Sequence, residues 1–273
     1  MPADLLDGRT QVVERYLGTI GVRPGEPTRE LLDELISAHV ATLPFSSVSV
    51  RLGEELPLRL ESVADRVVSR RRGGYCFEHN LLMFEALAEL GYAPRLVMAR
   101  VLLNGNPHPG LTHRVSAVTI DGADYLVDVG FGPQGPTACV PFDGSFVGEP
   151  WRQVRLVDLG GGHLLAEAAS AGQHQAMYRF ELTQYGATDC EVGHFYSHRH
   201  PESHFVNTLV ASRMLPGQTR SLRNRDYWVL RPDEIAQARV ADAADLRRIL
   251  IDELGFIVSE AESATLFTAI AGD

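Results

Sequence analysis

The sequence is poor in cysteine, in positive charge and in long apolar runs, and each shortage excludes a class of protein. Its three cysteines among 273 residues are far apart and form no CxxC pair, which argues against a disulfide framework or a thiolate zinc site. No stretch of about 18 apolar residues occurs, and the first residues lack the basic start and apolar segment of a leader. We therefore expect a soluble, cytoplasmic protein.

The charge balance narrows the choice of partners. The chain has 25 Lys and Arg against 35 Asp and Glu, a formal net charge of −10. Nucleic acids and anionic membrane surfaces select for clustered positive charge, so we expect neither as a partner. An anionic ligand would have to be held by local groups.

The hydrophobic pattern predicts an α+β fold, since 45% hydrophobic residues can fill a substantial core. Helical periodicity runs from residue 9 to about 90 and includes a strong helix from 76 to 90, while strand periodicity dominates from 95 to about 182. The tail, with one apolar stretch at 205–214, a strand at 226–230 and a helix near 241–253, suggests a smaller mixed segment. We expect three parts: a helical bundle (1–92), an antiparallel β-barrel (93–200) and an α/β lid (201–273).

Cys76 is the first candidate for chemistry. It follows Gly73-Gly74 and lies in the first turn of the predicted helix, where unpaired N–H groups and the helix dipole favour a thiolate. Glycine at these positions allows a sharp turn and a close approach by a substrate. Taken alone, a cysteine at a helix start is more often a small buried hydrophobe, so a base and an orienting group are needed.

His113 and Asp128 can supply these two groups. They lie on two predicted strands joined across Asp121-Gly122, a strong hairpin signal. With a two-residue loop, Ile120 faces Ala123, and Asp128 falls on the same face as His113 at a diagonal distance of roughly 7–8 Å. A carboxylate inside an apolar run would be costly to bury unpaired, so the pairing explains both residues better than either alone.

Three segments together closely resemble the motifs of the arylamine N-acetyltransferases, in order and in spacing. They are Arg71-Arg72-Gly73-Gly74-Tyr75-Cys76-Phe77-Glu78-His79-Asn80, Thr112-His113 and Leu126-Val127-Asp128-Val129-Gly130-Phe131-Gly132. The likeness extends from Pro44-Phe45 through Val129 and returns at residues 200–205, so it covers most of the chain.

This resemblance implies a fold and a mechanism. The family fold is a helical bundle, a β-barrel and a mixed lid around a papain-like and transglutaminase-like catalytic core. By resemblance Cys76 is the nucleophile, His113 the base and Asp128 the orienting acid, with acetyl-CoA as donor substrate and no permanently bound cofactor or metal. The implied route is ping-pong transfer to an arylamine, arylhydroxylamine or hydrazine. The substrate-binding residues expected around the thiol are Phe45, Val101, Thr112, Phe131, Gly132 and Phe205.

Several positions depart from the usual family pattern. Ser46-Ser47 stands where Glu-Asn commonly follows Pro-Phe, which predicts a different wall for the acceptor pocket. Leu103 replaces a Trp of some bacterial members, the loop at 104–111 is short, and His79 replaces the commoner Gln. None of these changes touches the three catalytic candidates.

Two further clusters have a structural interpretation. His194, His198, His200 and His204 are unevenly spaced and have no cysteine or paired carboxylate to complete a zinc site. The run Arg70-Arg71-Arg72 could bind CoA phosphates, but structural ion pairs are favoured. Cys139 and Cys190 lack glycine turns and obvious bases, so we expect them to be structural.

Three hypotheses compete with acetyl transfer. An amide synthase that closes or releases an amine-bearing polyketide would use the same Cys, His and Asp without CoA. A transglutaminase-like or protease-like enzyme would pass its acyl group to water or to a protein. A binding module without catalysis is the last.

Overall fold

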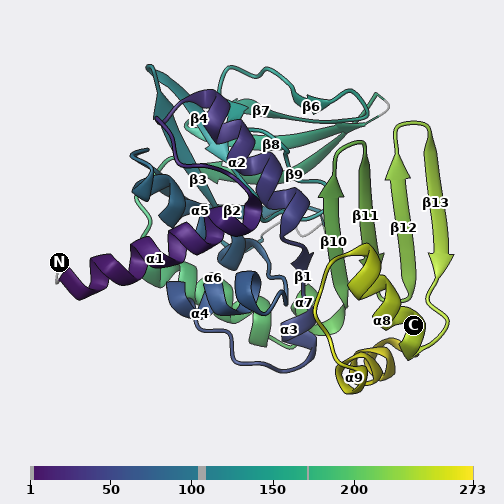
Figure 1. The fold of residues 1–273 in the computed structure, drawn as a ribbon. Helices are drawn as coiled ribbons and strands as arrows, with labels where there is room; N and C mark the ends of the chain where they lie inside the picture. Colours follow the sequence, from purple (N-terminus) through teal and green to yellow (C-terminus); the bar gives the residue numbers. More distant parts are fainter. Residues whose placement is uncertain (1–2, 104–108, 171, 273) are drawn as a thin grey trace.

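The computed structural model describes residues 3–103, 109–170 and 172–272, with side chains from residue 8 onward (Figure 1). Helices dominate the first third and strands the remainder. The helices are α1 (Ala3–Ile20), α2 (Arg29–Thr42), α3 (Val48–Arg51), α4 (Leu60–Ala64), the π-helical η1 (Asp65–Ser69), α5 (Cys76–Glu89), α6 (Ala187–Arg199), α7 (His204–Asn207), α8 (Ala243–Arg248), the π-helical η2 (Ile249–Glu253) and α9 (Glu260–Ile270).

The strands form two antiparallel sheets within the described residues. They are β1 (Phe45–Ser46), β2 (Arg95–Val101), β3 (His113–Ile120), β4 (Ala123–Val127), β5 (Val140–Pro141), β6 (Val147–Glu149), β7 (Arg152–Gly160), β8 (His163–Ser170), β9 (Gln173–Glu181), β10 (Val210–Leu215), β11 (Gln218–Arg223), β12 (Asp226–Arg231) and β13 (Glu234–Arg239).

The larger sheet has the order β5-β4-β3-β2-β9-β8-β7-β6 and curls until β5 contacts β7, so it is a nearly closed barrel. The smaller sheet, β1-β10-β11-β12-β13, stands beside α8 and α9 (Figure 1). This architecture confirms the predicted α+β fold with a helical N-terminal part, an antiparallel barrel and a mixed C-terminal part.

The hairpin between β3 and β4 has the predicted register. Ile120 pairs with Ala123 and Ser116 with Val127, across a turn in which Asp121 and Gly122 both have positive φ (50° and 80°). That conformation suits an Asp-Gly pair in a two-residue hairpin. The strand pairing ends at Val127, so Asp128 is the first residue beyond β4.

Several elements have no counterpart in the prediction from sequence, among them α6, β11, β13 and α9. Helix α6 is mostly polar and contains Gly193, which is required because a Cβ there would lie 2.3 Å from the carbonyl oxygen of Leu111. Strand β13 is an edge strand with mostly exposed side chains, and such strands carry no apolar alternation to detect.

The division of the chain after residues 92 and 200 stays a prediction. Strand β1 comes from the first range and pairs with β10 of the third, Phe45 opposite Ser212.

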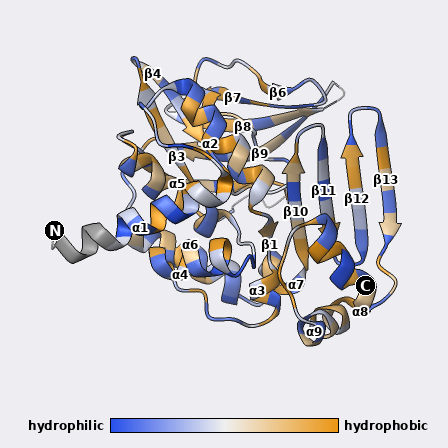
Figure 2. Ribbon diagram, in the orientation of Figure 1, coloured by the Kyte–Doolittle hydropathy of each residue, from blue (hydrophilic) through white to orange (hydrophobic). Residues whose placement is uncertain are grey.

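Hydrophobic and hydrophilic residues are mixed along the helices (Figure 2), and no helix in the described part of the chain is long and apolar enough to cross a membrane.

Candidate active site

The turn before α5 places Cys76 at the first position of the helix. Gly73 has a φ of +66°, and a Cβ at this residue would lie 2.6 Å from the carbonyl oxygen of Pro44. A Cβ at Gly74 would lie 2.9 Å from Oε2 of Glu78. Only glycine therefore fits this turn, which packs the backbone before Cys76 against the 44–46 segment.

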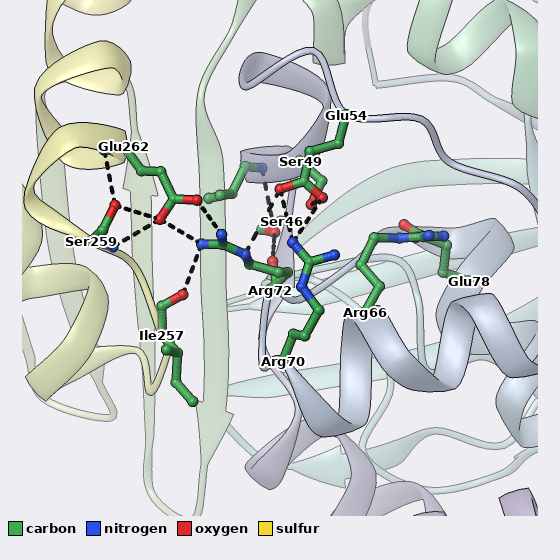
Figure 3. Close-up of polar contacts among 11 residues, drawn as sticks. Ser46, Ser49, Glu54, Arg66, Arg70, Arg72, Glu78, Ile257, Ser259 and Glu262 are labelled. Carbon is green, nitrogen blue, oxygen red and sulfur yellow. Dashed lines mark hydrogen bonds and ion pairs between the residues drawn. The ribbon is translucent and has the colours of Figure 1, made fainter.

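A buried ion pair supports the same turn. Oε2 of Glu78 accepts the backbone N–H of Tyr75 at 3.1 Å, and its Oε1 lies 2.6 Å from both Nε and Nη2 of Arg66 (Figure 3). Burial raises the pKa of Glu78, and the Arg66 charge only partly opposes that shift. The Glu78 carboxylate therefore caps the start of α5, and Arg66 of η1 holds this carboxylate in place.

His113 and Asp128 are in direct contact, as the hairpin register predicted. Nε2 of His113 lies 2.8 Å from Oδ2 of Asp128, and both side chains are almost fully buried. Cys76 adjoins His113: both residues line one cavity, and the interaction with Cys76 is one of the effects that raise the pKa of His113. Because Nε2 is engaged by Asp128, Nδ1 is the ring nitrogen left to exchange a proton at the sulfur.

The Asp128 carboxylate accepts four hydrogen bonds. Oδ2 takes bonds from His113 and from the hydroxyl of Tyr178 at 2.9 Å. Oδ1 takes bonds from Nδ2 of Asn80 at 3.0 Å and from the backbone N–H of Gly130 at 2.9 Å. Such saturation holds a buried carboxylate ionised and in one orientation.

The electrostatics of the pair follow from these contacts. Burial lowers the pKa of His113, but the Asp128 charge and the bonds to Asp128 and Cys76 outweigh it, so the pKa is raised. Burial raises the pKa of Asp128, yet the opposing effects of His113, Asn80 and Gly130 leave it lowered. The site therefore favours an imidazolium next to a carboxylate.

A cavity of about 650 Å³ opens above Cys76 and His113. It contains five of the six predicted substrate-binding residues: Phe45, Val101, Thr112, Phe131 and Phe205. Gly132 does not line it, but has a φ of +87° and packs behind it, where a Cβ would lie 3.1 Å from the Phe45 ring.

The predicted residues differ in what they present to the cavity. Phe131 packs edge-on against His113, with ring centroids 5.2 Å apart, and Phe45 packs against Phe205 at 6.0 Å. Thr112 contacts the sulfur through its backbone, because its carbonyl oxygen lies 3.5 Å from Sγ of Cys76. The Cys76 thiol therefore faces a cavity whose walls include the rings of Phe45, Phe131 and Phe205.

The departures from the family pattern lie partly behind the cavity wall and partly on it. Ser46 donates to the carbonyl of Arg72 at 3.0 Å and Ser47 to that of Thr208 at 2.9 Å, so both hold backbone and neither lines the cavity. Leu103 does line it. The first part of the short loop, residues 104–108, lies outside the described residues.

The arginine run forms structural ion pairs. Nη1 of Arg72 donates to the carbonyl of Ile257 at 2.9 Å and to Glu262 at 3.0 Å, and Arg70 lies 3.4 Å from Glu54 (Figure 3). The contacts of Arg72 connect the C-terminal part of the chain to the segment just before Gly73. The prediction of structural ion pairs is confirmed for Arg70 and Arg72.

His194 has a structural environment of its own. Its Nδ1 accepts from the Tyr75 hydroxyl at 2.7 Å, and its Nε2 donates to the carbonyl of Leu56 at 2.6 Å. Burial lowers the pKa of His194 to about 4. Across the described ranges, no group of three His, Cys, Asp or Glu side chains is arranged to hold a metal ion.

Two contributors were missed by the sequence-based analysis. Asn80 was noted only as part of a motif, yet it bridges Asp128 and the backbone N–H of Val129. Tyr178 comes from β9, 50 residues away from Asp128 along the chain, and no local pattern indicates such a long-range contact. The strand periodicity predicted up to about residue 182 is the only available signal.

A thiol at a helix start, an imidazole and a buried carboxylate in line define a cysteine-dependent acyl-transfer site. Residues 28–263 match the N-acetyltransferase family. An arylamine N-acetyltransferase of Mycobacterium tuberculosis is 37% identical over 245 residues, which covers 86% of this chain and 85% of the relative.

Solved structures agree with the sequence comparison. The arylamine N-acetyltransferase of Salmonella typhimurium has a TM-score of 0.88 at 30% identity, covering 94% of this chain and 98% of that one. The Mycobacterium marinum enzyme, solved in complex with CoA, has a TM-score of 0.88 at 33% identity, covering 94% and 99%. This chain belongs to the arylamine N-acetyltransferase family of acyltransferases. Membership favours acetyl transfer over the three competing hypotheses.

Proposed function

We propose that this enzyme transfers an acetyl group from acetyl-CoA to arylamines, arylhydroxylamines or hydrazines through an acetylated Cys76. The observation that carries the proposal is the Cys76, His113 and Asp128 line at the floor of an aromatic cavity. Support for the donor comes from the related Mycobacterium marinum enzyme, whose structure is a complex with CoA.

In the first half-reaction the Cys76 thiolate attacks the carbonyl carbon of the acetyl thioester. The imidazolium of His113 and the N–H groups at the start of α5 stabilise negative charge here. Collapse of the tetrahedral intermediate breaks the bond to the CoA sulfur, which leaves with the proton from Nδ1 of His113. The products are free CoA and a thioester on Cys76.

In the second half-reaction an amine nitrogen attacks the acetyl carbon on Cys76. The now neutral Nδ1 of His113 accepts the proton of the amine, and the thiolate leaves. Asp128 keeps Nε2 engaged throughout, so the ring presents the same nitrogen to both substrates. The second half-reaction restores the starting thiolate and imidazolium. CoA leaves before the amine reacts with the acetylated Cys76, and this order of release and binding is the chemical basis of ping-pong kinetics.

The cavity walls favour a flat, apolar acceptor. Phe45, Phe131 and Phe205 present aromatic surface beside the thiol, and aromatic rings pack well against one another in offset or edge-on geometry. An aryl ring held there would present its amine to the thioester on Cys76. No permanent cofactor is needed for either half-reaction.

Intact-mass spectrometry tests the proposal directly. We expect incubation with acetyl-CoA alone to add one acetyl group to the wild-type protein, located at Cys76 by peptide mapping. Addition of an arylamine or hydrazine should then remove the label and yield the amide. The Cys76→Ser variant should stay unlabelled by the same donor.

The competing hypotheses give other results. An amide synthase would take an acyl group from a carrier-type donor and leave acetyl-CoA unused. A hydrolase would turn over acyl donors without any amine, or cleave a peptide faster than it acetylates an arylamine. Absence of an acetyl adduct at Cys76, with the protein folded, would falsify the proposed route.

A further inference from the structure

Three buried side chains form a hydrogen-bonded chain that the proposed reaction does not use. The hydroxyl of Tyr16 lies 2.7 Å from Nδ1 of His39, and Nε2 of His39 lies 2.7 Å from Nδ1 of His79. Each comes from a different helix, α1, α2 and α5. All three side chains are almost completely buried.

The hydrogen bonds that connect Tyr16, His39 and His79 can run in only one direction when both imidazoles are neutral. Nε2 of His79 faces two carbonyl oxygens, Gly74 at 3.1 Å and Pro44 at 3.2 Å, so it carries the proton. Nδ1 of His79 must then accept from His39, and Nδ1 of His39 must accept from the Tyr16 hydroxyl. Every ring nitrogen is satisfied in this arrangement.

Neutral rings are what this location favours. Burial lowers the pKa of His79 to about 4, although the two carbonyl bonds and the Asp128 charge partly oppose it. Burial and the neighbouring His79 lower the pKa of His39 well below its ordinary value.

The two carbonyls that accept from His79 adjoin the active site. Gly74 lies two residues before Cys76, and its carbonyl also accepts the backbone N–H of Ser46 at 2.6 Å. Pro44 precedes Phe45, which forms a bridge with Gly74 and lines the cavity. The Nε2–H group of His79 therefore bonds both to the turn before Cys76, at Gly74, and to the residue before Phe45, at Pro44.

We propose that His79, oriented by His39 and Tyr16, is a positioning residue that fixes the distance between the Cys76 thiol and the Phe45 wall of the acceptor pocket. This inference rests on the proposed function and adds a determinant of acceptor binding. His79 does not touch the reacting atoms. It acts through the carbonyls of Gly74 and Pro44.

The chemistry of residue 79 allows a rescue variant. A glutamine amide carries both an N–H donor and an acceptor oxygen, so it can bond to the carbonyls and to His39 together. A leucine of similar size can do neither: it removes one donor from the carbonyls of Gly74 and Pro44 and the acceptor of His39, and the Gly74 carbonyl keeps only its bond from Ser46. The pair His79→Gln and His79→Leu separates hydrogen bonding from filling of space.

The test compares three measurements on folded protein: the KM of an arylamine, the rate of Cys76 alkylation by iodoacetamide, and Tm. We expect His79→Leu to raise the acceptor KM and to slow alkylation, each by about tenfold. His79→Gln should restore both to within about twofold of the wild type. Leu87→Ala, a buried truncation on the same helix outside the cavity, is the stability control.

The outcomes are distinct. A His79→Leu protein that loses Tm as Leu87→Ala does, with KM and alkylation unchanged, would overturn the inference, as would failure of glutamine to restore them. If His79→Leu does not fold, His39→Leu breaks the chain one link away and should give a smaller change of the same kind. Alkylation needs no acetyl-CoA, so failure of the proposed function shows separately, as absence of the acetyl adduct in the wild type.

Discussion

The backbone at Gly130 passes so close to the nucleophile turn that a Cβ there would lie 2.6 Å from the Cα of Cys76. It would also lie 2.8 Å from Nδ2 of Asn80, the atom that donates to Asp128. The N–H of Gly130 is itself one of the donors to that carboxylate. Close packing of two backbones thus sets the spacing of the thiol and the acid.

Gly130→Ala should lower both stability and activity, because the added methyl group must push α5 and the 128–130 segment apart. Overpacking of this kind costs about 1–3 kcal/mol, and we expect kcat/KM to fall by about 100-fold, since small displacements of catalytic groups are this costly. Gly18→Ala, at an exposed helical site with nothing within 4 Å, is the control and should be neutral or slightly stabilising. Full activity in Gly130→Ala would contradict the packing argument.

Asp128→Asn should abolish most of the activity. The carboxylate accepts four hydrogen bonds, whereas an amide has one acceptor oxygen and would place its N–H₂ against at least one donor. We expect a loss of at least about 10³-fold in kcat/KM, with the acetylation rate of Cys76 as the primary measurement. Asp124→Asn, an exposed acid on β4, should retain wild-type rates.

The sequence allowed prediction of the hairpin register, and with it the contact between His113 and Asp128, because these depend on local signals. Gly73-Gly74 marks the turn before Cys76, and the two-residue loop at Asp121-Gly122 determines which strand residues share a face. The family motifs supplied the order of roles, and most of the predicted pocket residues line one cavity.

What could not be predicted depends on contacts between distant segments. Tyr178 reaches Asp128 from β9, and His39 reaches His79 from α2, and neither contact leaves a periodic pattern in the chain. Helix α6 also depends on a long-range contact, because Gly193 lets it pack closely against Leu111 and Phe77. A polar sequence with a glycine at its centre predicts a loop on local grounds.

Glu78→Gln should destabilise the protein strongly, because it leaves the Arg66 guanidinium buried without its counter-charge. Breaking one side of a buried pair costs about 3–5 kcal/mol. Glutamine can still accept the Tyr75 N–H, so the cap itself is retained. The free energy of unfolding in urea is the measurement. Glu89→Gln, a partly exposed acid on the same helix, should cost less than about 1 kcal/mol.

The buried histidines predict a loss of stability on mild acidification. Burial lowers the folded-state pKa of His39 and His79, the latter to about 4, whereas both are near 6.5 when unfolded. Below pH 6.5 the unfolded chain therefore binds more protons than the folded one, so stability falls as pH falls toward the folded-state values. For His79 alone the loss reaches roughly 3 kcal/mol by pH 4.

Urea unfolding at several pH values between 6.5 and 4.5 measures this loss, and this window separates it from the contributions of Asp128 and His113. Asp128, whose pKa is lowered, loses its contribution only as pH falls below its ordinary value of 3.8. The contribution of His113, whose pKa is raised, is complete below pH 6.5 and is lost on the alkaline side. His79→Gln should reduce the acid slope without removing it, since His39 and His194 still titrate. An unfolding free energy that stays constant from pH 6.5 to 4.5 would show that these rings are not held neutral.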